Sequence, residues 1–324
     1  MNTRLAGSLY VTEGDLDMNI LVTGGAGFIG SHVLEQLNTK DDVQVVIYDN
    51  LSSGSISHVP EIMELVEGEV RDHQALEAVF AAHSFDAVIH LAAQTMVPLS
   101  VAQPVLDCQI NLGGVLNVLE CCRTYGVPHV LFSSSAAVYG DNPNVPLKET
   151  EAVMPTSPYG VTKMTTEQYL RVYHELYGID ATVFRFANVY GERQGEKGEG
   201  GVISIFCKLL SQGKGVTVFG DGRQTRDFVY AGDIAHAIIC GLSLKGFHII
   251  NVSTGKETSL NELIRCFALA VGTQVSVTYT KPRQGDILRS VLSNAALKQQ
   301  LHLTPAMTLE QGISQTYTWY KENQ

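Results

Sequence analysis

Hydrophobic positions along this chain follow two alternating patterns. Short apolar runs of four to six residues, the length of buried strands, recur at Asn19 to Val22, Val43 to Tyr48, Met63 to Val66, Ala87 to His90, Val130 to Ser133, Ala181 to Phe186 and His248 to Val252. Between most of these runs the apolar residues return at helical spacing, as in residues 28–37. Strands that alternate with helices form parallel sheets covered on both faces. The pattern therefore predicts an α/β fold built on a doubly wound parallel sheet of about seven strands.

The pattern changes near residue 190. Residues 191–201 are too rich in glycine and charge to form a regular helix or strand. We expect this segment to form a loop that covers a binding site. A helix at 202–211, a short strand at 216–219, further helices and a strand at 275–279 follow. This order predicts a smaller C-terminal α/β lobe.

The two patterns divide the chain into unequal parts. Residues 18–190, completed by about 228–255, are expected to form a nucleotide-binding domain, and residues 191–324 most of a substrate-binding lobe. We expect the ligand in the cleft between them. We predict no function for the leader, residues 1–17.

The first predicted strand ends in a glycine-rich turn. Glycines 25, 27 and 30 fit the spacing of a dinucleotide-binding turn, and glycines 24, 27 and 30 fit its three-residue variant. Such glycines allow a tight turn, close approach of a pyrophosphate, and contact between helix and strand. The helix that starts at Phe28 presents free amide groups and a positive dipole end to this turn. The sequence thus predicts a phosphate site in a Rossmann fold.

An acidic residue ends the second predicted strand. Asp49 follows Gly30 by 19 residues, where a carboxylate accepts hydrogen bonds from the hydroxyls of an adenosine ribose. A carboxylate there repels a 2'-phosphate, and residues 50–53 supply no Arg or Lys to offset it. The predicted cofactor is therefore NAD and not NADP.

A tyrosine and a lysine share one face of a later helix. Pro158 is well tolerated at a first helical position, which places Tyr159 and Lys163 one turn apart. Lowering the pKa of a phenol from about 10 to about 7 requires about 4 kcal/mol, of which an ammonium at roughly 5 Å supplies about 3. A nearby nicotinium charge can supply the rest, so Tyr159 is predicted to be a general base. Ser135, at the end of the fifth strand, is placed to relay a proton or hold the reacting oxygen.

Composition limits the partners. The 324 residues include 22 basic and 33 acidic side chains, a formal net charge of −11, which argues against nucleic acid or an anionic membrane as the main partner. The six cysteines show no C-x-x-C pair, and we expect them to be reduced, buried and structural. No apolar run approaches the ~20 residues of a membrane span, and residues 1–17 fit a secretory signal poorly. We predict a cytoplasmic protein without a metal site.

Five ordered motifs carry a family resemblance: the glycine turn, HLAA at 90–93, SSSAAVYG at 133–140, SPYGVTK at 157–163 and RFANVYG at 185–191. Over about residues 18 to 320 the chain resembles the extended short-chain dehydrogenase/reductases, and among them the UDP-glucose 4-epimerase family. The resemblance implies tightly bound NAD that is regenerated in each turnover. It also implies that Tyr159, aided by Ser135, removes the proton of the sugar 4'-hydroxyl while hydride leaves C4', and that hydride returns to the other face of a 4-keto sugar.

The resemblance also assigns the site residues. Around the adenosine diphosphate half of NAD it places Gly24, Gly27, Phe28, Ile29, Gly30, Asp49, Asn50, Ser53, Glu69 and Val70. Around the nicotinamide half it places Leu91, Ala92, Ala93, Ser133, Tyr159, Lys163 and Phe186. At the substrate it places Thr95, Ser135, Tyr159, Asn188, Val202, Phe219, Arg226, Arg283, Asp286 and Ser290. Family members usually have Asp in place of Glu69, which implies a slightly altered adenine contact.

Several activities fit this resemblance. The small Ser290 favours a UDP-hexose 4-epimerase that also accepts UDP-N-acetylglucosamine, while epimerisation of UDP-glucuronate or another nucleotide sugar remains open. Nucleotide-sugar 4,6-dehydratases carry Asp-Glu after the active-site serine or threonine, where this chain has Ala136 and Ala137. A non-catalytic NAD-sensing module tends to lose the Tyr and Lys that are present here.

The resemblance implies a homodimer. Two predicted helices, near 112–125 and 160–177, carry apolar residues beyond what one sheet face needs, namely Val115, Leu119, Cys122, Met164, Tyr169, Tyr173 and Leu176. We expect two subunits to pair these helices in a four-helix bundle. The alternative is that the stripes pack on the sheet of their own chain.

Overall fold

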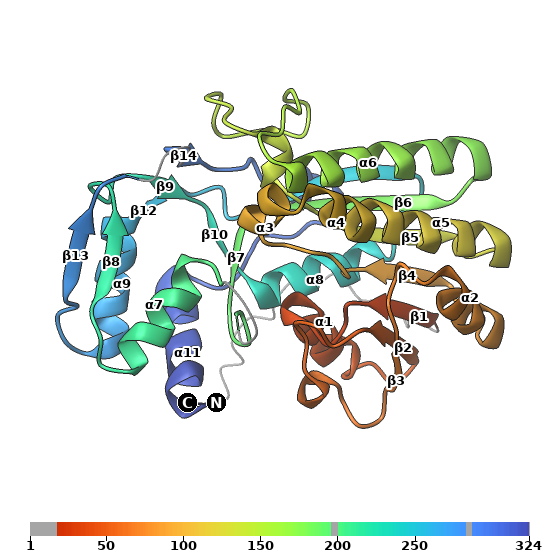
Figure 1. Cartoon of the computed structure of the whole chain (residues 1–324), viewed down its shortest axis with the longest axis horizontal. Coiled ribbons are helices and arrows are strands. Elements are labelled where there is room, and N and C mark those ends of the chain that lie inside the picture. Colours follow the sequence, from red (N-terminus) through yellow and green to blue (C-terminus); the bar gives the residue numbers. More distant parts are fainter. Residues whose placement is uncertain (1–17, 196–199, 283–286, 324) are drawn as a thin grey trace, which may run out of the picture.

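The computed structural model describes residues 18–195, 200–282 and 287–323. Its centre is a parallel sheet of seven strands in the order β11-β6-β5-β4-β1-β2-β3 (Figure 1). The strands are β1 (Met18–Thr23), β2 (Val43–Asp49), β3 (Glu64–Glu67), β4 (Ala87–His90), β5 (His129–Ser135), β6 (Asp180–Phe186) and β11 (Phe247–Val252). Every strand of this sheet overlaps a run that the sequence predicted, so the predicted doubly wound sheet is confirmed.

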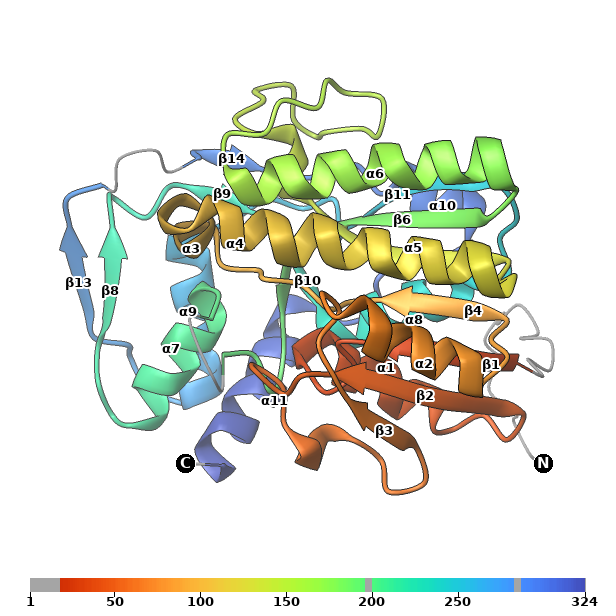
Figure 2. The same cartoon turned by 45° about the vertical axis from the view of Figure 1, so that its right-hand side comes forward.

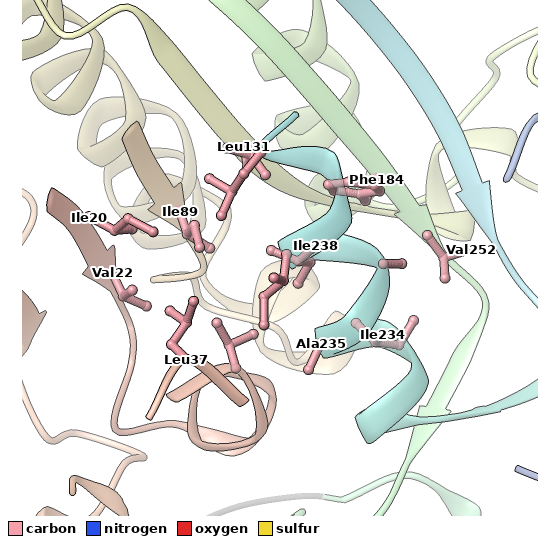
Figure 3. Packing of buried hydrophobic residues seen from close by; sticks show 14 of the residues in the cluster. Ile20, Val22, Leu37, Ile89, Leu131, Phe184, Ile234, Ala235, Ile238 and Val252 are labelled. Carbon is pink, nitrogen blue, oxygen red and sulfur yellow. The ribbon is translucent and has the colours of Figure 1, made fainter. Parts of the chain in front are cut away.

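Both faces of the sheet are buried. Ile20 and Val22 of β1 face one hydrophobic cluster, whereas Leu21 between them faces the other. The first cluster lies under α1 (Phe28–Leu37), α8 (Ala231–Gly241) and α10 (Ala295–Gln300), and Figure 3 shows the side chains of α8 packed against those of the sheet. The second lies under α2 (His73–Ala82), α5 (Gly114–Tyr125) and α6 (Pro158–Tyr177). Burial on both faces explains why the strands are continuous apolar runs.

The helices α5 and α6 lie side by side along one flank (Figure 2). The prediction that the apolar stripe of α5 is available to a second subunit is wrong. Val115, Leu119 and Cys122 are at most 2% exposed and belong to the core beneath the helix. On α6, Tyr169 and Leu176 are exposed. Shorter elements join these helices to the sheet: η1 (Ile56–His58), α3 (Val97–Ala102), α4 (Pro104–Cys108), the π-helix η2 (Gln109–Gly113) and η3 (Ala136–Tyr139).

The C-terminal lobe has its own core beside the carboxyl ends of the strands (Figure 1). Its elements are α7 (Val202–Ser211), β8 (Val216–Phe219), α9 (Leu260–Val271), β13 (Val277–Thr280) and α11 (Leu309–Glu322). The helix α7 and the strand β8 have the predicted bounds. Five short strands were not predicted: β7 (Asn188–Tyr190), β9 (Thr225–Arg226), β10 (Phe228–Tyr230), β12 (Thr258–Ser259) and β14 (Arg289–Ser290). Two or three residues are too few to show a period of their own.

Two compositional expectations can be compared with the structure. All six cysteines are free thiols, but Cys108 is exposed, so the expectation that all of them are buried is wrong. Cys108 ends the short helix α4, next to the buried Asp107. Within the described part of the chain, no helix has the length and apolar character that crossing a bilayer requires.

Candidate active site

A cavity of about 480 Å³ opens at the carboxyl ends of the central strands. The structure brings together around it every residue predicted to surround NAD, namely Gly24, Gly27, Phe28, Ile29, Gly30, Asp49, Asn50, Ser53, Glu69, Val70, Leu91, Ala92, Ala93, Ser133, Tyr159, Lys163 and Phe186. Open α/β sheets bind ligands at this edge. The cavity is therefore the candidate active site.

The glycine turn between β1 and α1 forms the floor of the cavity. Gly24 has φ +72°, and a Cβ there would lie 2.5 Å from the amide nitrogen of Ala92. A Cβ at Gly30 would collide with the carbonyl oxygen of Gly24. The turn thus closes only with glycine at both positions, and it leaves bare backbone at the start of α1. A dinucleotide pyrophosphate fits such a surface.

Acidic side chains stand at the ends of β2 and β3. Asp49 is 7% exposed, and its carboxylate accepts hydrogen bonds from the amides of Ala26 (3.0 Å) and Leu51 (2.8 Å). Glu69 accepts hydrogen bonds from Asn50 Nδ2 (3.0 Å) and from the guanidinium of Arg71 (2.9 Å). Burial alone would raise the pKa of Glu69, but these two hydrogen bonds lower it. Both carboxylates are therefore held in place at the rim of the cavity.

Tyr159 lies in the cavity wall, whereas its neighbour Ser135 is not among the residues around the cavity. The helix α6 begins at Pro158, as predicted, and the Ser157 side chain caps it by accepting from the Gly160 amide. This start directs the Tyr159 phenol toward Ser135, the last residue of β5, whose side chain is hydrogen-bonded to it. Burial raises the pKa of Tyr159 to about 12, a nearby carboxylate at Asp107 adds to this rise, and the hydrogen bond with Ser135 opposes it.

Lys163 lies one helical turn after Tyr159. Its Nζ donates to the carbonyl oxygen of Ser133 at 2.7 Å and lies 4.7 Å from the centre of the Phe132 ring and 5.8 Å from that of Tyr159. Burial lowers the pKa of Lys163 to about 7, against the opposing effect of Asp107 and Glu167. The expectation that the ammonium alone brings the Tyr159 pKa most of the way to neutrality is therefore wrong. Burial acts on both groups and outweighs their attraction.

The residues predicted to bind the substrate, unlike those predicted to bind NAD, do not all surround the cavity. Thr95 and Tyr159 line the cavity. In the lobe, Arg226 of β9 pairs in register with Ser290 of β14, and the Arg226 guanidinium donates to the carbonyl oxygen of Thr225 at 2.8 Å. Asn188 lies in β7, Val202 starts α7 and Phe219 ends β8. None of these five lobe residues is among those around the cavity, and the predicted residues Arg283 and Asp286 lie outside the described ranges.

Several polar residues of the cavity wall were missed, among them Arg193 and Gln94. Arg193 has φ 67°, and its guanidinium makes two hydrogen bonds, 2.5 and 2.9 Å long, with the carboxylate of Glu35 on α1. It belongs to the glycine-rich segment 191–201 expected over a site, so the segment was predicted but not the residue. Gln94 follows the HLAA motif directly and donates to Asp107 at 2.7 Å. No spacing in the sequence connects Gln94 with a residue on α4.

This combination of glycine turn, strand-end acid and tyrosine–lysine helix defines a nucleotide-binding enzyme of the extended short-chain dehydrogenase/reductase class. A family model described as the NAD dependent epimerase/dehydratase family matches residues 20–253. The match covers more than half of the chain, which therefore belongs to this family. The resemblance predicted from the five motifs is confirmed.

Solved structures similar to this chain include several nucleotide-sugar 4-epimerases. UDP-glucose 4-epimerase from Thermotoga maritima with UDP-glucose has a TM-score of 0.91 at 39% identity, covering 94% of this chain and 99% of that one. UDP-N-acetylglucosamine 4-epimerase from Methanobrevibacter ruminantium, in complex with UDP-N-acetylmuramic acid, scores 0.90 at 37% identity over 95% and 99%. UDP-glucose 4-epimerase from Thermus thermophilus in complex with NAD scores 0.87 at 40% identity over 94% and 99%. The likeness thus extends over both lobes.

Proposed function

We propose that this protein inverts C4 of a UDP-sugar and keeps NAD bound while doing so. The observation that carries the proposal is the position of Tyr159 and Lys163, one helical turn apart on α6, in the wall of the cavity that contains the glycine turn, with the Tyr159 phenol hydrogen-bonded to Ser135. Similarity to solved 4-epimerases over nearly the whole chain supports the same activity.

The cavity fits NAD by its own geometry. The bare turn from Gly24 to Gly30 and the first amides of α1 would hold the pyrophosphate, and Asp49 would accept from the adenosine ribose. Lys163 and Phe186 would lie at the nicotinamide end. When bound, NAD supplies the acceptor and later the donor of one hydride.

The side chains move the proton. In the proposed reaction, Tyr159 Oη takes the proton of the sugar 4-hydroxyl, Ser135 Oγ holds the same oxygen, and the ammonium of Lys163 stabilises the phenolate. The proton returns to the oxygen from Tyr159 once the sugar has presented its other face. Rotation of the sugar requires a firm hold on the diphosphate and a loose hold on the ring. We assign the diphosphate contact to Arg226, with Arg283 as a second arginine.

We expect the substrate range to include N-acetylated sugars. Ser290 is adjacent to Arg226 in the paired strands β14 and β9, and its small side chain leaves room beside the diphosphate contact. The similarity to epimerases named for UDP-glucose and for UDP-N-acetylglucosamine supports both substrates. The helix η3 begins with Ala136 and Ala137 directly after Ser135, so no carboxylate stands there to expel water in a dehydratase reaction.

Incubation without added cofactor tests the proposal. Purified protein is mixed with UDP-glucose, UDP-N-acetylglucosamine or UDP-glucuronate, and the stereochemistry at C4 is followed by NMR. We expect inversion in at least one hexose sample, and loss of inversion with retained cofactor in the Tyr159→Phe variant. Stoichiometric consumption of pyridine nucleotide, or no inversion of any of the three sugars, would contradict the proposal.

We further propose that two subunits associate through the flank formed by α6. Val161, Tyr169, Leu176 and Tyr177 are exposed and recur at helical spacing on one side of α6. Exposed apolar patches of this kind mark association surfaces. Light scattering should give twice the mass of one chain, and Leu176→Asp should give a monomer. A monomeric mass for the unmodified protein would exclude this association.

A further inference from the structure

A buried carboxylate that accepts its side-chain hydrogen bonds from neutral donors in the described part of the chain lies near the candidate catalytic pair. Asp107 of α4 is 1% exposed. It accepts three hydrogen bonds, from Gln94 Nε2 at 2.7 Å, from Asn111 Nδ2 at 3.1 Å and from Thr162 Oγ1 at 3.0 Å. All three donors are neutral side chains. Buried charges in proteins normally have a charged partner or a metal, so this one calls for a physical reason.

A second buried carboxylate near Lys163 shows the usual arrangement. Glu167, also 1% exposed, is ion-paired with Arg185 of β6, which donates from Nε at 3.0 Å and from Nη2 at 2.6 Å. Ser134 Oγ donates to it as well, at 2.6 Å. Glu167 thus has a cation as its direct partner, although its charge also raises the pKa of Lys163. Among the described residues, no Lys or Arg is hydrogen-bonded or ion-paired with Asp107.

The groups that face this charge belong to the catalytic turn. Thr162, which donates to Asp107, lies between Tyr159 and Lys163 on α6. The negative charge of Asp107 raises the pKa of both Tyr159 and Lys163. On β4, His90 is buried beside Lys163, and burial lowers its pKa to about 3, so it stays neutral. The remaining neighbours, Gln94 and Asn111, do not titrate.

The same contacts join α6 to the wall of the cavity. The Gln94 side chain donates to Asp107 and accepts from the backbone amide of Met96. Its backbone amide donates to Asn111 Oδ1 at 2.8 Å, and Asn111 Nδ2 donates to the carbonyl oxygen of Gln94 at 2.9 Å. Thr95 and Met96 line the cavity. One carboxylate therefore links the cavity wall to the helix turn that carries Tyr159.

From this geometry we infer that Asp107 is a positioning residue that serves as the buried counter-charge of Lys163 and thereby sets the pH at which the Tyr159–Lys163 pair works. The inference rests on the proposed function, because it concerns the same pair of side chains. Asp107 itself is not among the residues around the cavity.

The Asp107→Asn variant separates charge from geometry. Its oxygen can still accept from Gln94 and Asn111, and its new amide can donate to Thr162 Oγ1, whose hydrogen then goes to the carbonyl oxygen of Tyr159, 2.9 Å away. The hydrogen bonds are retained and the negative charge is lost. Since a negative charge raises the pKa of neighbouring acids, its removal should lower those of Tyr159 and Lys163 together. We expect a shift of roughly 1 pH unit, as found for close buried charges.

Two measurements on the NAD-containing protein test the inference. The first is the pH dependence of kcat for C4 inversion, whose acidic limb should move to lower pH in Asp107→Asn. The second is the ionisation of the Tyr159 phenol, obtained near 295 nm as the difference between each protein and its Tyr159→Phe counterpart. Because this titration needs no turnover, it tests the inference even if the proposed reaction fails.

Matched variants complete the test. Asp227, also 1% exposed, accepts hydrogen bonds from Thr254, Gly255 and the backbone of Leu292, which are neutral groups far along the chain from α6. Replacement of Asp227 by Asn should leave the midpoint of the Tyr159 phenol titration unchanged. Asp107→Ser removes the same charge with a smaller side chain and should shift the midpoint in the same direction as Asp107→Asn, while Asp107→Glu should restore it. An unchanged phenol midpoint in both charge-removing variants, or an equal shift in Asp227→Asn, would overturn the inference.

Discussion

The sheet domain and the C-terminal lobe position their candidate site residues in different ways. In the domain, residues at the ends of long buried strands and at the start of α1 and α6 converge on one cavity. In the lobe, Asn188, Phe219, Arg226 and Ser290 lie in or at the ends of strands two to four residues long. Strands buried on both faces are fixed by their own apolar pattern. The short ones depend on a partner far along the chain. The domain can therefore hold a ligand that is the same in every reaction rigidly, while the residues of the lobe can change with the substrate.

The largest effect should follow the loss of the buried ammonium in the domain. Lys163→Met keeps the side-chain volume but removes the charge, and we expect kcat to fall by about 10³-fold, within the range for loss of acid–base assistance. Lys298→Met, at an exposed position of α10, should leave kcat unchanged. A loss of less than ten-fold in Lys163→Met would show that the domain does not hold the reacting groups as proposed.

The same variant gives a pH prediction for the protein stripped of NAD. Burial lowers the pKa of Lys163 to about 7, below its value of about 10.4 in the unfolded chain. Between these values the unfolded state binds more protons, so the free energy of unfolding should rise as pH increases from 7 to 10. Urea midpoints should show this rise in the unmodified protein, and Lys163→Met should flatten it. An identical slope in both proteins would contradict the assignment.

A smaller effect should follow a methyl group in the glycine turn. Gly24→Ala combines a positive φ with a collision at Ala92, and we expect a loss of about 2 to 3 kcal/mol in stability together with loss of bound NAD. Gly126 has φ +74° at the end of α5, with no atom within 4 Å of an added Cβ. Gly126→Ala should cost only about 1 kcal/mol and retain NAD. Calorimetry and the absorbance of released cofactor measure both. Equal cofactor content in the two variants would mean that the turn does not approach NAD closely.

The smallest effects should distinguish the sheet domain from the C-terminal lobe most clearly. Arg226→Ala should raise KM for the UDP-sugar by about 10- to 30-fold, as expected for a charge-assisted contact, without loss of NAD. Glu35→Gln weakens the hold on Arg193 at the cavity wall, and we expect NAD to dissociate a few-fold faster with no change in the sugar KM, since a partly exposed ion pair contributes little. Steady-state kinetics and cofactor exchange provide the two readouts. If each variant changed both the sugar KM and the dissociation of NAD, the sheet domain and the lobe would not act separately.

The sequence predicted the domain well because local pattern and global packing agree there. The strand β4 has the predicted bounds, and α6 starts at Pro158, as the motif indicated. The stripe on α5 was misassigned because periodicity reveals that a helix has an apolar face but not what covers it. Val115, Leu119 and Cys122 face the sheet of their own chain.

The candidate site was predicted where a motif specifies it and missed where distant side chains meet. Arg193 is fixed by Glu35, 158 residues earlier, and Gln94 by Asp107 on a separate helix. Neither pair has a characteristic spacing. The pKa of Tyr159 was misjudged for a related reason: the sequence supplied the neighbouring charge, but the extent of burial of the phenol and the ammonium is a property of the assembled fold.

The register between β9 and β14 has a consequence for altering the enzyme. Arg226 and Ser290 are direct partners across two strands of only two residues each. So short a ribbon cannot absorb a bulky replacement at one position without displacing the other. Under the proposed roles, attempts to broaden or narrow the accepted sugars through residue 290 will also alter retention of the nucleotide, and selection for a new specificity will have to screen both traits together.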